Sequence, residues 1–391
     1  MEGVQDRERD GMLRQAMRSA ELKGILAWYP EDLVMVSGSF TCLAIALCLY
    51  PLQGNPVFYA SRFEPDDVLP AGFLHRRFTP QPGTRPGAWG ELAGLLREDL
   101  RRLGIAMEEL GVPEDGGGHA VPSFPGETPP LTQAALSAIL GGARPRDGTA
   151  AFTAAGLRKT RREVEAIRRT NAAAGAGLTA FYATLVSGLT EAEVAAVVEA
   201  AIQSQSGKNG CRLARGWAHV QGGANVLLAG TYSRSSGAAL ADGDMVVLEL
   251  ATCVDGYWSD LTRTGCVGRT GERQRALMAA VKEAQAAAIA AIRPGMSHEA
   301  VDAAARSVLE ARGCGSGFTH GCGHHVGFRY HDRGPVLAAG HKEPLAEGMV
   351  ITVEPGSYGS EFGGGCRFED DVLVGALGAE VLSPIGITAP G

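Results

Sequence analysis

The feature that most restricts the fold is an apolar run, Met245–Ala251 (MVVLELA), with a single carboxylate, Glu249, near its centre. Such a run is typical of a buried β-strand, where an unpaired charge is costly. Asp255-Gly256 then predicts a two-residue hairpin turn, which would pair Ala251 with Asp260. Glu249 and Asp260 would therefore converge on one face of the hairpin. Either a cation lies between them, or the hairpin forms a sheet edge with both carboxylates exposed.

Two later segments repeat this combination of apolar strand and carboxylate. Met349–Glu354 (MVITVE) ends in Glu354, and Arg367–Val374 (RFEDDVLV) carries Glu369 before an apolar tail. A solvated strand face explains any one of these carboxylates, but it explains all four together poorly. A shared pair of divalent metal ions would neutralise the whole set.

A histidine-rich segment supplies candidate nitrogen ligands. Of the nine histidines in the chain, four lie within His320–His331. Gly321 and Gly323 argue against a helical pair of zinc-binding histidines, and a glycine-rich loop that passes close to a site fits better. The alternative is a surface turn that is rich in histidine. The isolated histidines are expected at the surface: His75, His119, His298 and His341.

The length and charge of the chain limit its organisation and its partners. With 391 residues, two domains are expected, and we place their boundary near residue 152, giving residues 1–152 and 153–391. The net charge of −7 without a block of basic residues provides no surface for nucleic acid or an anionic membrane. We therefore expect a short peptide or small-molecule substrate.

The cysteines and the polar beginning of the chain predict a cytoplasmic protein. The eight cysteines show no CxxC spacing, and Met1–Arg18 is too charged for a secretory signal. Leu33–Ala60 has no charged residue and raises the question of a membrane span. Pro51, Gly54 and Pro56 interrupt it, so we expect buried strands instead and no membrane partner.

Each half of the chain has its own pattern of elements. In the first half, expected helices at Arg7–Leu22, Trp89–Leu103 and Leu131–Leu140 alternate with strands, which predicts an α/β domain. The second half contains two units of helix, glycine, Ser/Thr cap and helix, with the caps at Thr190 and Ser297. This repeat predicts a pseudo-symmetric α+β domain.

The combined motifs resemble the "pita-bread" family of methionine aminopeptidase, aminopeptidase P, prolidase and creatinase. The resemblance is carried, in order along the chain, by Gly256–Thr264, His320–His331, Thr352–Gly356 and Arg367–Asp371, with looser matches at Leu157–Ile167 and Gly24–Gly38. It implies an α/β N-terminal creatinase-like domain and an α+β pseudo-symmetric pita-bread C-terminal domain. It also implies a homodimer.

The resemblance assigns roles to individual residues. Asp260 and Glu369 would bridge two metal ions, His324 and Glu354 would complete one site, and Glu249 stands where the peptidases have an aspartate. Ligands of this kind suit manganese first, with cobalt, iron or zinc as alternatives.

Four residues would take part in catalysis around the metal ions. His320 and His331 match histidines that bind substrate and help to stabilise the tetrahedral intermediate, Arg367 would orient the carboxylates, and Glu354 would be the general base.

Two departures from the family pattern leave several functions open. Glu249 is longer than the usual aspartate, and Gly230 stands where the peptidases carry a substrate-side histidine, which His219 or Tyr232 would have to replace. The leading prediction is a metal-dependent hydrolase of a C–N bond, most simply an Xaa-Pro peptidase on short peptides. The alternatives are an amidine or guanidino hydrolase with one or no metal, as in creatinase and ectoine hydrolase, a lyase, or a non-catalytic peptide-binding protein.

Overall fold

A computed structural model describes residues 6–41, 46–80, 89–114, 133–230 and 234–383 of the chain. The chain divides into two units, Met1–Gly156 and Leu157–Gly391, which are described separately below. The boundary expected near residue 152 falls inside helix α5 (Thr149–Gly156), because the chain remains helical beyond the preceding turn-rich segment.

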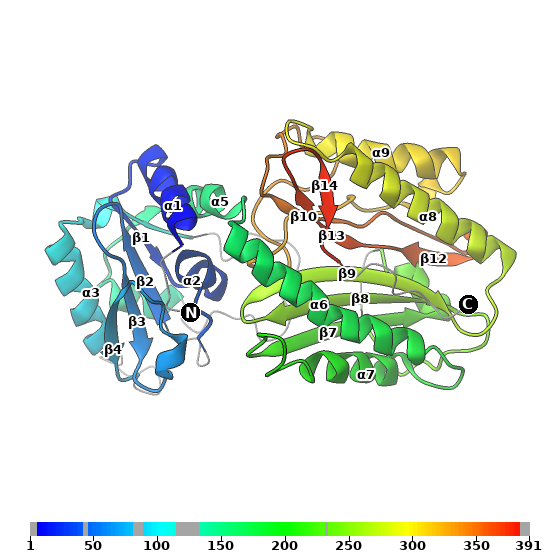
Figure 1. Cartoon of the computed structure of the whole chain (residues 1–391), viewed down its shortest axis with the longest axis horizontal. Helices are drawn as coiled ribbons and strands as arrows, with labels where there is room; N and C mark the ends of the chain where they lie inside the picture. The colour runs from blue at the N-terminus through cyan, green and yellow to red at the C-terminus, as the bar shows by residue number, and fades with distance from the viewer. Residues whose placement is uncertain (1–5, 42–45, 81–88, 115–132, 231–233, 384–391) are drawn as a thin grey trace. The chain divides into compact units, whose positions relative to one another are not determined.

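The N-terminal unit is built around a mixed six-stranded sheet in the order β4-β3-β2-β1-β5-β6 (Figure 1). Strands β1 and β2 are antiparallel, whereas β1 and β5 are parallel. The strands are β1 (Gly24–Ala27), β2 (Ala46–Pro51), β3 (Val57–Ser61), β4 (Leu74–Phe78), β5 (Leu110–Val112) and β6 (Arg146–Asp147). The helices besides α5 are α1 (Arg7–Ser19), α2 (Pro30–Ser37), α3 (Gly90–Leu103) and α4 (Gln133–Ile139).

The uncharged segment Leu33–Ala60 is only partly the set of strands that we expected. Its beginning belongs to helix α2, since Pro30 occupies the first turn and Gly38 ends the helix in a left-handed conformation with φ of 69°. Strands β2 and β3 follow and are fully buried. Within the described residues, no helix has the length and apolar character needed to cross a membrane.

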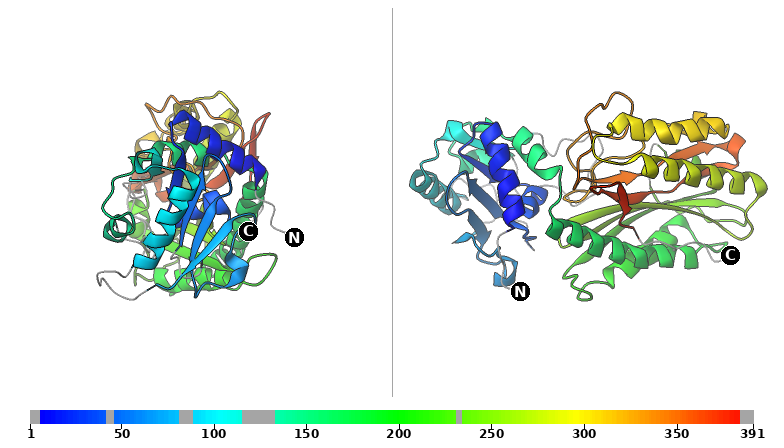
Figure 2. Two further views of the ribbon diagram at one scale, coloured as in Figure 1. Left: turned by 90° about the vertical axis from the view of Figure 1, so that its left-hand side faces the viewer. Right: turned by 45° about the horizontal axis from the view of Figure 1, so that its top comes forward.

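The C-terminal unit repeats a pattern of two helices followed by strands. Helices α6 (Arg161–Ala183) and α7 (Glu191–Gln203) precede the sheet of β7 (Ala214–Gly222), β8 (Met245–Val254) and β9 (Tyr257–Cys266). Helices α8 (Glu272–Ala291) and α9 (His298–Ala311) precede β10 (Val350–Val353), β11 (Gly356–Gly359), β12 (Gly364–Arg367), β13 (Asp370–Val374) and β14 (Ala379–Val381). Figures 1 and 2 show each helix pair on the outer side of its own strands.

Helices α6, α7 and α9 of this unit begin at a threonine or serine that caps them. The hydroxyl of Thr160 accepts a hydrogen bond from the Glu163 amide at 3.4 Å, and the Glu163 carboxylate accepts one from the Thr160 amide at 2.8 Å. Thr190 starts α7 with the same reciprocal arrangement, and Ser297 caps α9. Such caps satisfy amides that would otherwise lack a partner at a helix N-terminus.

The β8–β9 hairpin has the predicted register, with Ala251 opposite Asp260 and Val254 opposite Tyr257. Its turn residues Asp255 and Gly256 have φ of 51° and 85°, as a tight two-residue turn requires. Alternate β8 residues, including Val246, Leu248 and Leu250, pack into the core formed with α6 and α7. Glu249 therefore points to the opposite face of the sheet.

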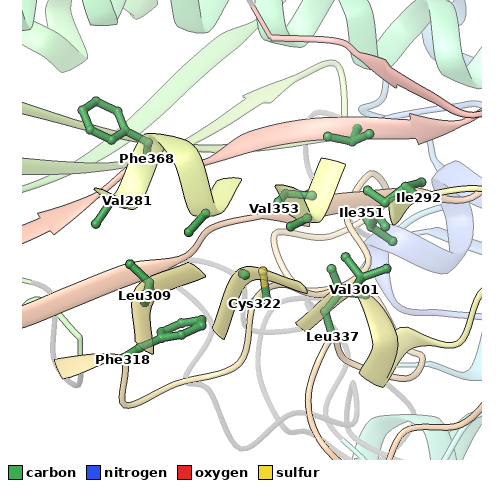
Figure 3. Packing of buried hydrophobic residues seen from close by; sticks show 14 of the residues in the cluster. Val281, Ile292, Val301, Leu309, Phe318, Cys322, Leu337, Ile351, Val353 and Phe368 are labelled. Atoms are coloured by element: carbon green, nitrogen blue, oxygen red, sulfur yellow. The ribbon is translucent and has the colours of Figure 1, made fainter. Parts of the chain in front are cut away.

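A second core lies beneath α8 and α9, where Val281 and Leu309 pack with Ile351, Val353 and Phe368 (Figure 3). Here the expected single strand Arg367–Val374 is interrupted. Arg367 ends β12 and Asp370 begins β13, so Phe368 and Glu369 lie between two strands that pair with different partners. This break turns the Phe368 ring into the core and leaves Glu369 beside β9.

Candidate metal centre

The centre of the C-terminal unit gathers carboxylates on the face of β8–β9 that is turned away from α6 and α7. Glu249 pairs across the sheet with Thr262, and Asp260 is diagonal to Glu249. Since strand residues alternate in direction, Glu249, Asp260 and Thr262 share one face. Their exposed fractions are 7%, 1% and 0%, so the two carboxylates are buried rather than placed at a solvated edge.

The histidine-rich segment crosses this face as an irregular loop without a helix. Arg306 on α9 donates hydrogen bonds to the carbonyl oxygens of Phe318 at 3.0 Å and His320 at 2.6 Å, and forms an ion pair with Asp302. Asp302 in turn accepts a hydrogen bond from the Cys322 amide at 3.1 Å. Helix α9 therefore fixes the beginning of the loop.

The end of the loop is held by a buried ion pair. Lys159 Nζ lies 2.8 Å from Asp332 Oδ2, and both side chains are almost fully buried. Asp332 also accepts hydrogen bonds from the amides of Phe328 at 3.3 Å and Arg329 at 2.7 Å. These contacts close the segment into a compact turn between His325 and Asp332.

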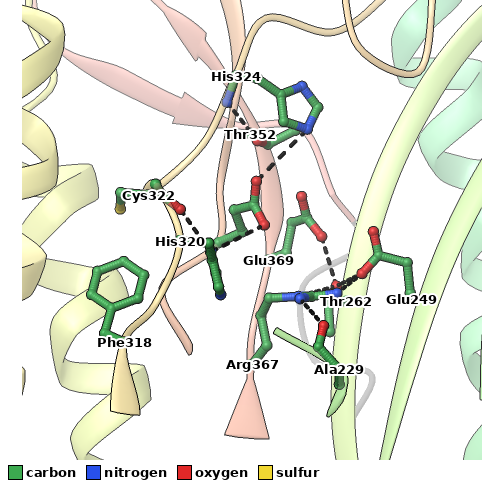
Figure 4. Close-up of polar contacts among 12 residues, drawn as sticks. Ala229, Glu249, Thr262, Phe318, His320, Cys322, His324, Thr352, Arg367 and Glu369 are labelled. Atoms are coloured by element: carbon green, nitrogen blue, oxygen red, sulfur yellow. Dashed lines mark hydrogen bonds and ion pairs between the residues drawn. The ribbon is translucent and has the colours of Figure 1, made fainter. Parts of the chain in front are cut away.

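His324 presents one ring nitrogen to the carboxylates. Its Nδ1 lies 2.9 Å from the His325 carbonyl oxygen, which assigns the proton to Nδ1 and makes Nε2 the nitrogen with the lone pair that a metal ligand needs. Nε2 lies 3.3 Å from Asp260 Oδ2 and 3.7 Å from Glu354 Oε1. The His324 amide donates to the Thr352 hydroxyl at 3.0 Å, which ties the loop to β10 (Figure 4).

The same side chains leave buried oxygen atoms unsatisfied. Among the described residues, three buried carboxylate oxygens have no hydrogen-bond partner. They are Oδ1 and Oδ2 of Asp260 and Oε1 of Glu369. Ligand atoms of His324, Glu354 and Glu369 lie within 4.8 Å of one another, as do those of Glu249, Asp260 and Glu369. Ligand atoms of Asp260, His324 and His331 form a further group of this kind. Buried carboxylate oxygens without donors, clustered with imidazole nitrogens, fit a divalent cation.

Burial also changes the acid–base behaviour of these groups. It raises the pKa of Asp260, Glu354 and Glu369 above the usual carboxyl range, and the neighbouring carboxylates add to the effect at Asp260 and Glu354. This direction is expected where several anions share a volume that water does not fill. A bound cation would offset the repulsion directly.

Arg367 spans the side of the centre nearest Glu249 (Figure 4). Its guanidinium forms an ion pair with Glu249, donates from Nε to the Thr262 hydroxyl at 2.9 Å, and donates from Nη1 to the carbonyl oxygen of Ala229 at 2.9 Å. Nη1 also lies 3.0 Å from the Tyr358 hydroxyl. Arg367 is only 4% exposed, so this orientation is fixed inside the unit.

His320 and His331 flank the centre from the loop. His320 Nδ1 lies 3.9 Å from Glu354 Oε2, and its Nε2 lies 3.3 Å from the Tyr358 hydroxyl. The His331 ring stacks on His324 with ring centroids 3.5 Å apart. Both residues are half-buried, whereas His324 and His325 are buried.

Gly230, at the position where the family resemblance predicts a substrate-side histidine, is adjacent to Tyr358. A β-carbon on Gly230 would meet the Tyr358 ring, so the tyrosine fills this space. His219 lies opposite Glu249 in the β7–β8 register and therefore on the same face of the sheet. Tyr232, the other proposed replacement, lies outside the described residues.

Sequence reasoning missed several residues of the centre. It placed His298 at the surface, but His298 is 1% exposed and its Nε2 lies 3.1 Å from that of His325. Tyr330 donates its hydroxyl hydrogen to Glu249 and was not foreseen, although it lies inside the histidine-rich segment. Thr262 was detectable, because strand alternation places it beside Asp260 on the same face.

The chain has relatives among known protein families. Residues 165–376 match the sequence model described as Metallopeptidase family M24. The chain is 35% identical over 225 residues to an Xaa-Pro dipeptidase of Pyrococcus furiosus, a match that covers 58% of this chain and 62% of that protein. It is 36% identical over 228 residues to the probable dipeptidase PepE of Mycobacterium bovis, covering 56% and 57%. These matches thus span less than two thirds of each relative.

Solved structures resemble the fold over nearly the whole chain. An Xaa-Pro dipeptidase from Bacillus anthracis superimposes with a TM-score of 0.78 at 24% identity and covers 97% of this chain and 98% of its own. The dipeptidase PepE of Mycobacterium ulcerans has a TM-score of 0.71 at 28% identity, covering 97% and 95%. The expected two-part fold, with an N-terminal α/β unit and a pseudo-symmetric C-terminal unit, is confirmed by these similarities.

Proposed function

The chain belongs to metallopeptidase family M24, and we propose that it is a metal-dependent dipeptidase that hydrolyses the Xaa-Pro bond of short peptides. The observation that carries this proposal is the set of unsatisfied carboxylate oxygens of Asp260 and Glu369 around His324 Nε2. Relatives named Xaa-Pro dipeptidase and probable dipeptidase support the substrate class.

The metal ligands in this proposal are Asp260, His324, Glu354 and Glu369. Three carboxylates and one imidazole form a mostly hard ligand set, which favours manganese, with cobalt, iron and zinc as alternatives. When bound, such an ion polarises the scissile carbonyl and lowers the pKa of a water molecule. Two manganese ions were expected, but the second would depend on Glu249, which already contacts Arg367.

The residues at the metal site would transfer the proton, bind the substrate and position the carboxylates. Glu354 is the most exposed of the proposed ligand side chains, at 16%, so it can accept the proton of the attacking water and pass it to the leaving proline nitrogen. His320 and His331 face the centre from the loop and would hydrogen-bond the substrate carbonyl or carboxylate. Arg367 and Thr262 hold the carboxylates in fixed positions.

The alternative of an amidine or guanidino hydrolase requires a carboxylate that is free to hold substrate nitrogen. Glu249 is the residue that suggested this chemistry, but its carboxylate is engaged by Arg367 and Tyr330. The peptidase proposal is therefore favoured over the amidine hydrolase.

We also propose that the protein is a cytoplasmic homodimer with reduced cysteines. The seven cysteines in the described residues are all free thiols, which supports the reduced state.

A substrate panel tests the proposal. The manganese-loaded full chain is incubated with Xaa-Pro dipeptides, with matched Xaa-Ala dipeptides, and with creatine as a guanidino compound. We expect release of free proline, with the Xaa-Pro peptides preferred and the Asp260→Asn variant inactive. Turnover of creatine that resists chelation would contradict the proposal, and so would the absence of turnover across all the peptides.

A further inference from the structure

The two sides of the metal centre differ in whether their carboxylate oxygens already have partners. At the His324 side, Asp260 Oδ1 and Oδ2 and Glu369 Oε1 are buried without a hydrogen-bond donor among the described residues. At the other side, both oxygens of Glu249 are engaged, Oε1 by the Tyr330 hydroxyl and Oε2 by the Arg367 guanidinium. Among the four carboxylates of the centre, the described oxygen atoms without a hydrogen-bond partner therefore belong to Asp260 and Glu369 and not to Glu249.

Distance alone does not separate the two sides, since Glu249 lies within 4.8 Å of ligand atoms of Asp260 and Glu369. The position of the guanidinium does separate them. Thr262 Oγ1 accepts a hydrogen bond from Arg367 Nε at 2.9 Å and lies within donating distance of both Glu369 Oε2 at 2.7 Å and Glu249 Oε2 at 3.0 Å. The Arg367 guanidinium, in contrast, forms its ion pair with Glu249. Glu249 thus draws its neutralising charge from the guanidinium.

The Arg367 guanidinium has little freedom to leave this position. Its remaining hydrogen bonds are to neutral groups, the Ala229 carbonyl oxygen at 2.9 Å and the Tyr358 hydroxyl at 3.0 Å. Arg367 and Glu249 are 4% and 7% exposed, so water cannot replace either partner. An arginine remains protonated even when it is buried, and separating a buried ion pair leaves an uncompensated charge.

From these contacts we infer that the centre holds one divalent ion, bound by Asp260, His324, Glu354 and Glu369, and that the guanidinium of Arg367 takes the place of a second ion beside Glu249. The inference rests on the proposed metal-dependent function. The additional methylene of glutamate extends the carboxylate by about 1.5 Å compared with aspartate. With this length, Glu249 forms its ion pair with Arg367.

The number of bound ions tests the inference without reference to activity. The full chain is loaded with excess manganese and desalted, and the metal is counted by mass spectrometry while electron paramagnetic resonance reports coupling between ions. We expect about one ion per chain and the spectrum of an isolated ion. Glu249→Gln keeps the shape and removes the charge, and it should still hold about one ion, whereas Asp260→Asn should hold less than about a tenth of that.

Two ions per chain with a spin-coupled spectrum, falling to one in Glu249→Gln, would overturn the inference. The wild-type count decides the question even if this variant does not fold. The proposed function fails separately, because one bound ion without hydrolysis of Xaa-Pro peptides would contradict the dipeptidase and still support the single-ion centre. No bound ion would overturn both.

Discussion

Gly230 and Tyr358 lie so close that a β-carbon on residue 230 would be 2.6 Å from Cε2 of the tyrosine ring. The ring therefore fills the space that a side chain at position 230 would need. Its hydroxyl lies 3.0 Å from Arg367 Nη1 and 3.3 Å from His320 Nε2. Tyr358 is thus the polar group that connects these two residues on this side of the centre.

The Gly230→Ala substitution should displace Tyr358 and disturb both contacts. We expect kcat/KM for an Xaa-Pro dipeptide to fall about tenfold, equivalent to about 1.4 kcal/mol, while manganese remains bound. In a Tyr358→Ala background the space is free, so Gly230→Ala should cost little more. Additive losses in the double variant would contradict the steric explanation.

The Asp260→Asn substitution removes a negative charge from the centre at nearly constant volume. We expect manganese affinity and hydrolysis each to fall at least about a hundredfold, because charge on the ligand is needed to hold a divalent cation. Asp242→Asn, a matched change at an exposed carboxylate, should leave both unchanged. Equal metal content in the two variants would exclude Asp260 as a ligand.

The stacked histidines His324 and His331 should have separable roles. His331→Ala is expected to lower kcat/KM about ten- to a hundredfold with manganese content unchanged, since its ring faces the proposed substrate path. His324→Ala should lose the metal, because Nε2 is the nitrogen beside Asp260 and Glu354. Loss of metal in His331→Ala would show that this histidine is a ligand as well.

Much of the centre was predictable from local rules. The hairpin turn at Asp255-Gly256 and the period of a strand were enough to bring Glu249 and Asp260 onto one face, as the structure has them. The helix starts at Thr190 and Ser297 followed from capping residues. Strand alternation also places Thr262 at the centre, because residues two positions apart on a strand, such as Asp260 and Thr262, point to the same face.

Other features depend on contacts between segments far apart in sequence, which no local pattern contains. The ion pair of Arg367 with Glu249, the Tyr330 hydroxyl on the same carboxylate, and the burial of His298 against His325 are of this kind. Helix α2 was misassigned for a different reason. Its apolar residues fit a buried strand and a buried helix equally well, and the terminal signals at Pro30 and Gly38 decided the outcome.

The raised carboxyl pKa values predict how the metal-free protein responds to pH. Burial holds the pKa of Asp260, Glu354 and Glu369 above the ordinary range, so the folded state favours their neutral forms. Their contribution to stability is fully present below about pH 4 and is lost as the pH rises through the raised folded-state values.

Thermal unfolding measures this effect. Metal-free protein should unfold at a lower temperature at about pH 8 than at about pH 5.5, and manganese should raise Tm more at the higher pH. Asp260→Asn, which lacks one of the titrating groups, should show a smaller change with pH. If the Tm of the metal-free wild type changed with pH no more than the Tm of Asp260→Asn, the titration of buried carboxylates would not explain the pH dependence.

Arg306 is expected to position the histidine loop. Its guanidinium donates to the carbonyl oxygens of Phe318 and His320, so Arg306→Met should leave two acceptors without their donor. We expect a Tm lowered by about 2–8 °C and kcat/KM lowered about tenfold, with manganese still bound. Arg312→Met removes a more exposed ion pair with Glu283 and serves as the control. Equal effects in the two variants would argue against a specific role for Arg306.

The central claim is that hydrolysis of Xaa-Pro peptides requires the metal ion bound between Asp260, His324, Glu354 and Glu369. The most direct measurement is kcat/KM for an Xaa-Pro dipeptide in samples whose manganese content is varied from none to saturation. The account predicts activity that is absent in the metal-free chain and rises in proportion to bound manganese. Activity that is independent of metal content, or no activity at full occupancy, would contradict it.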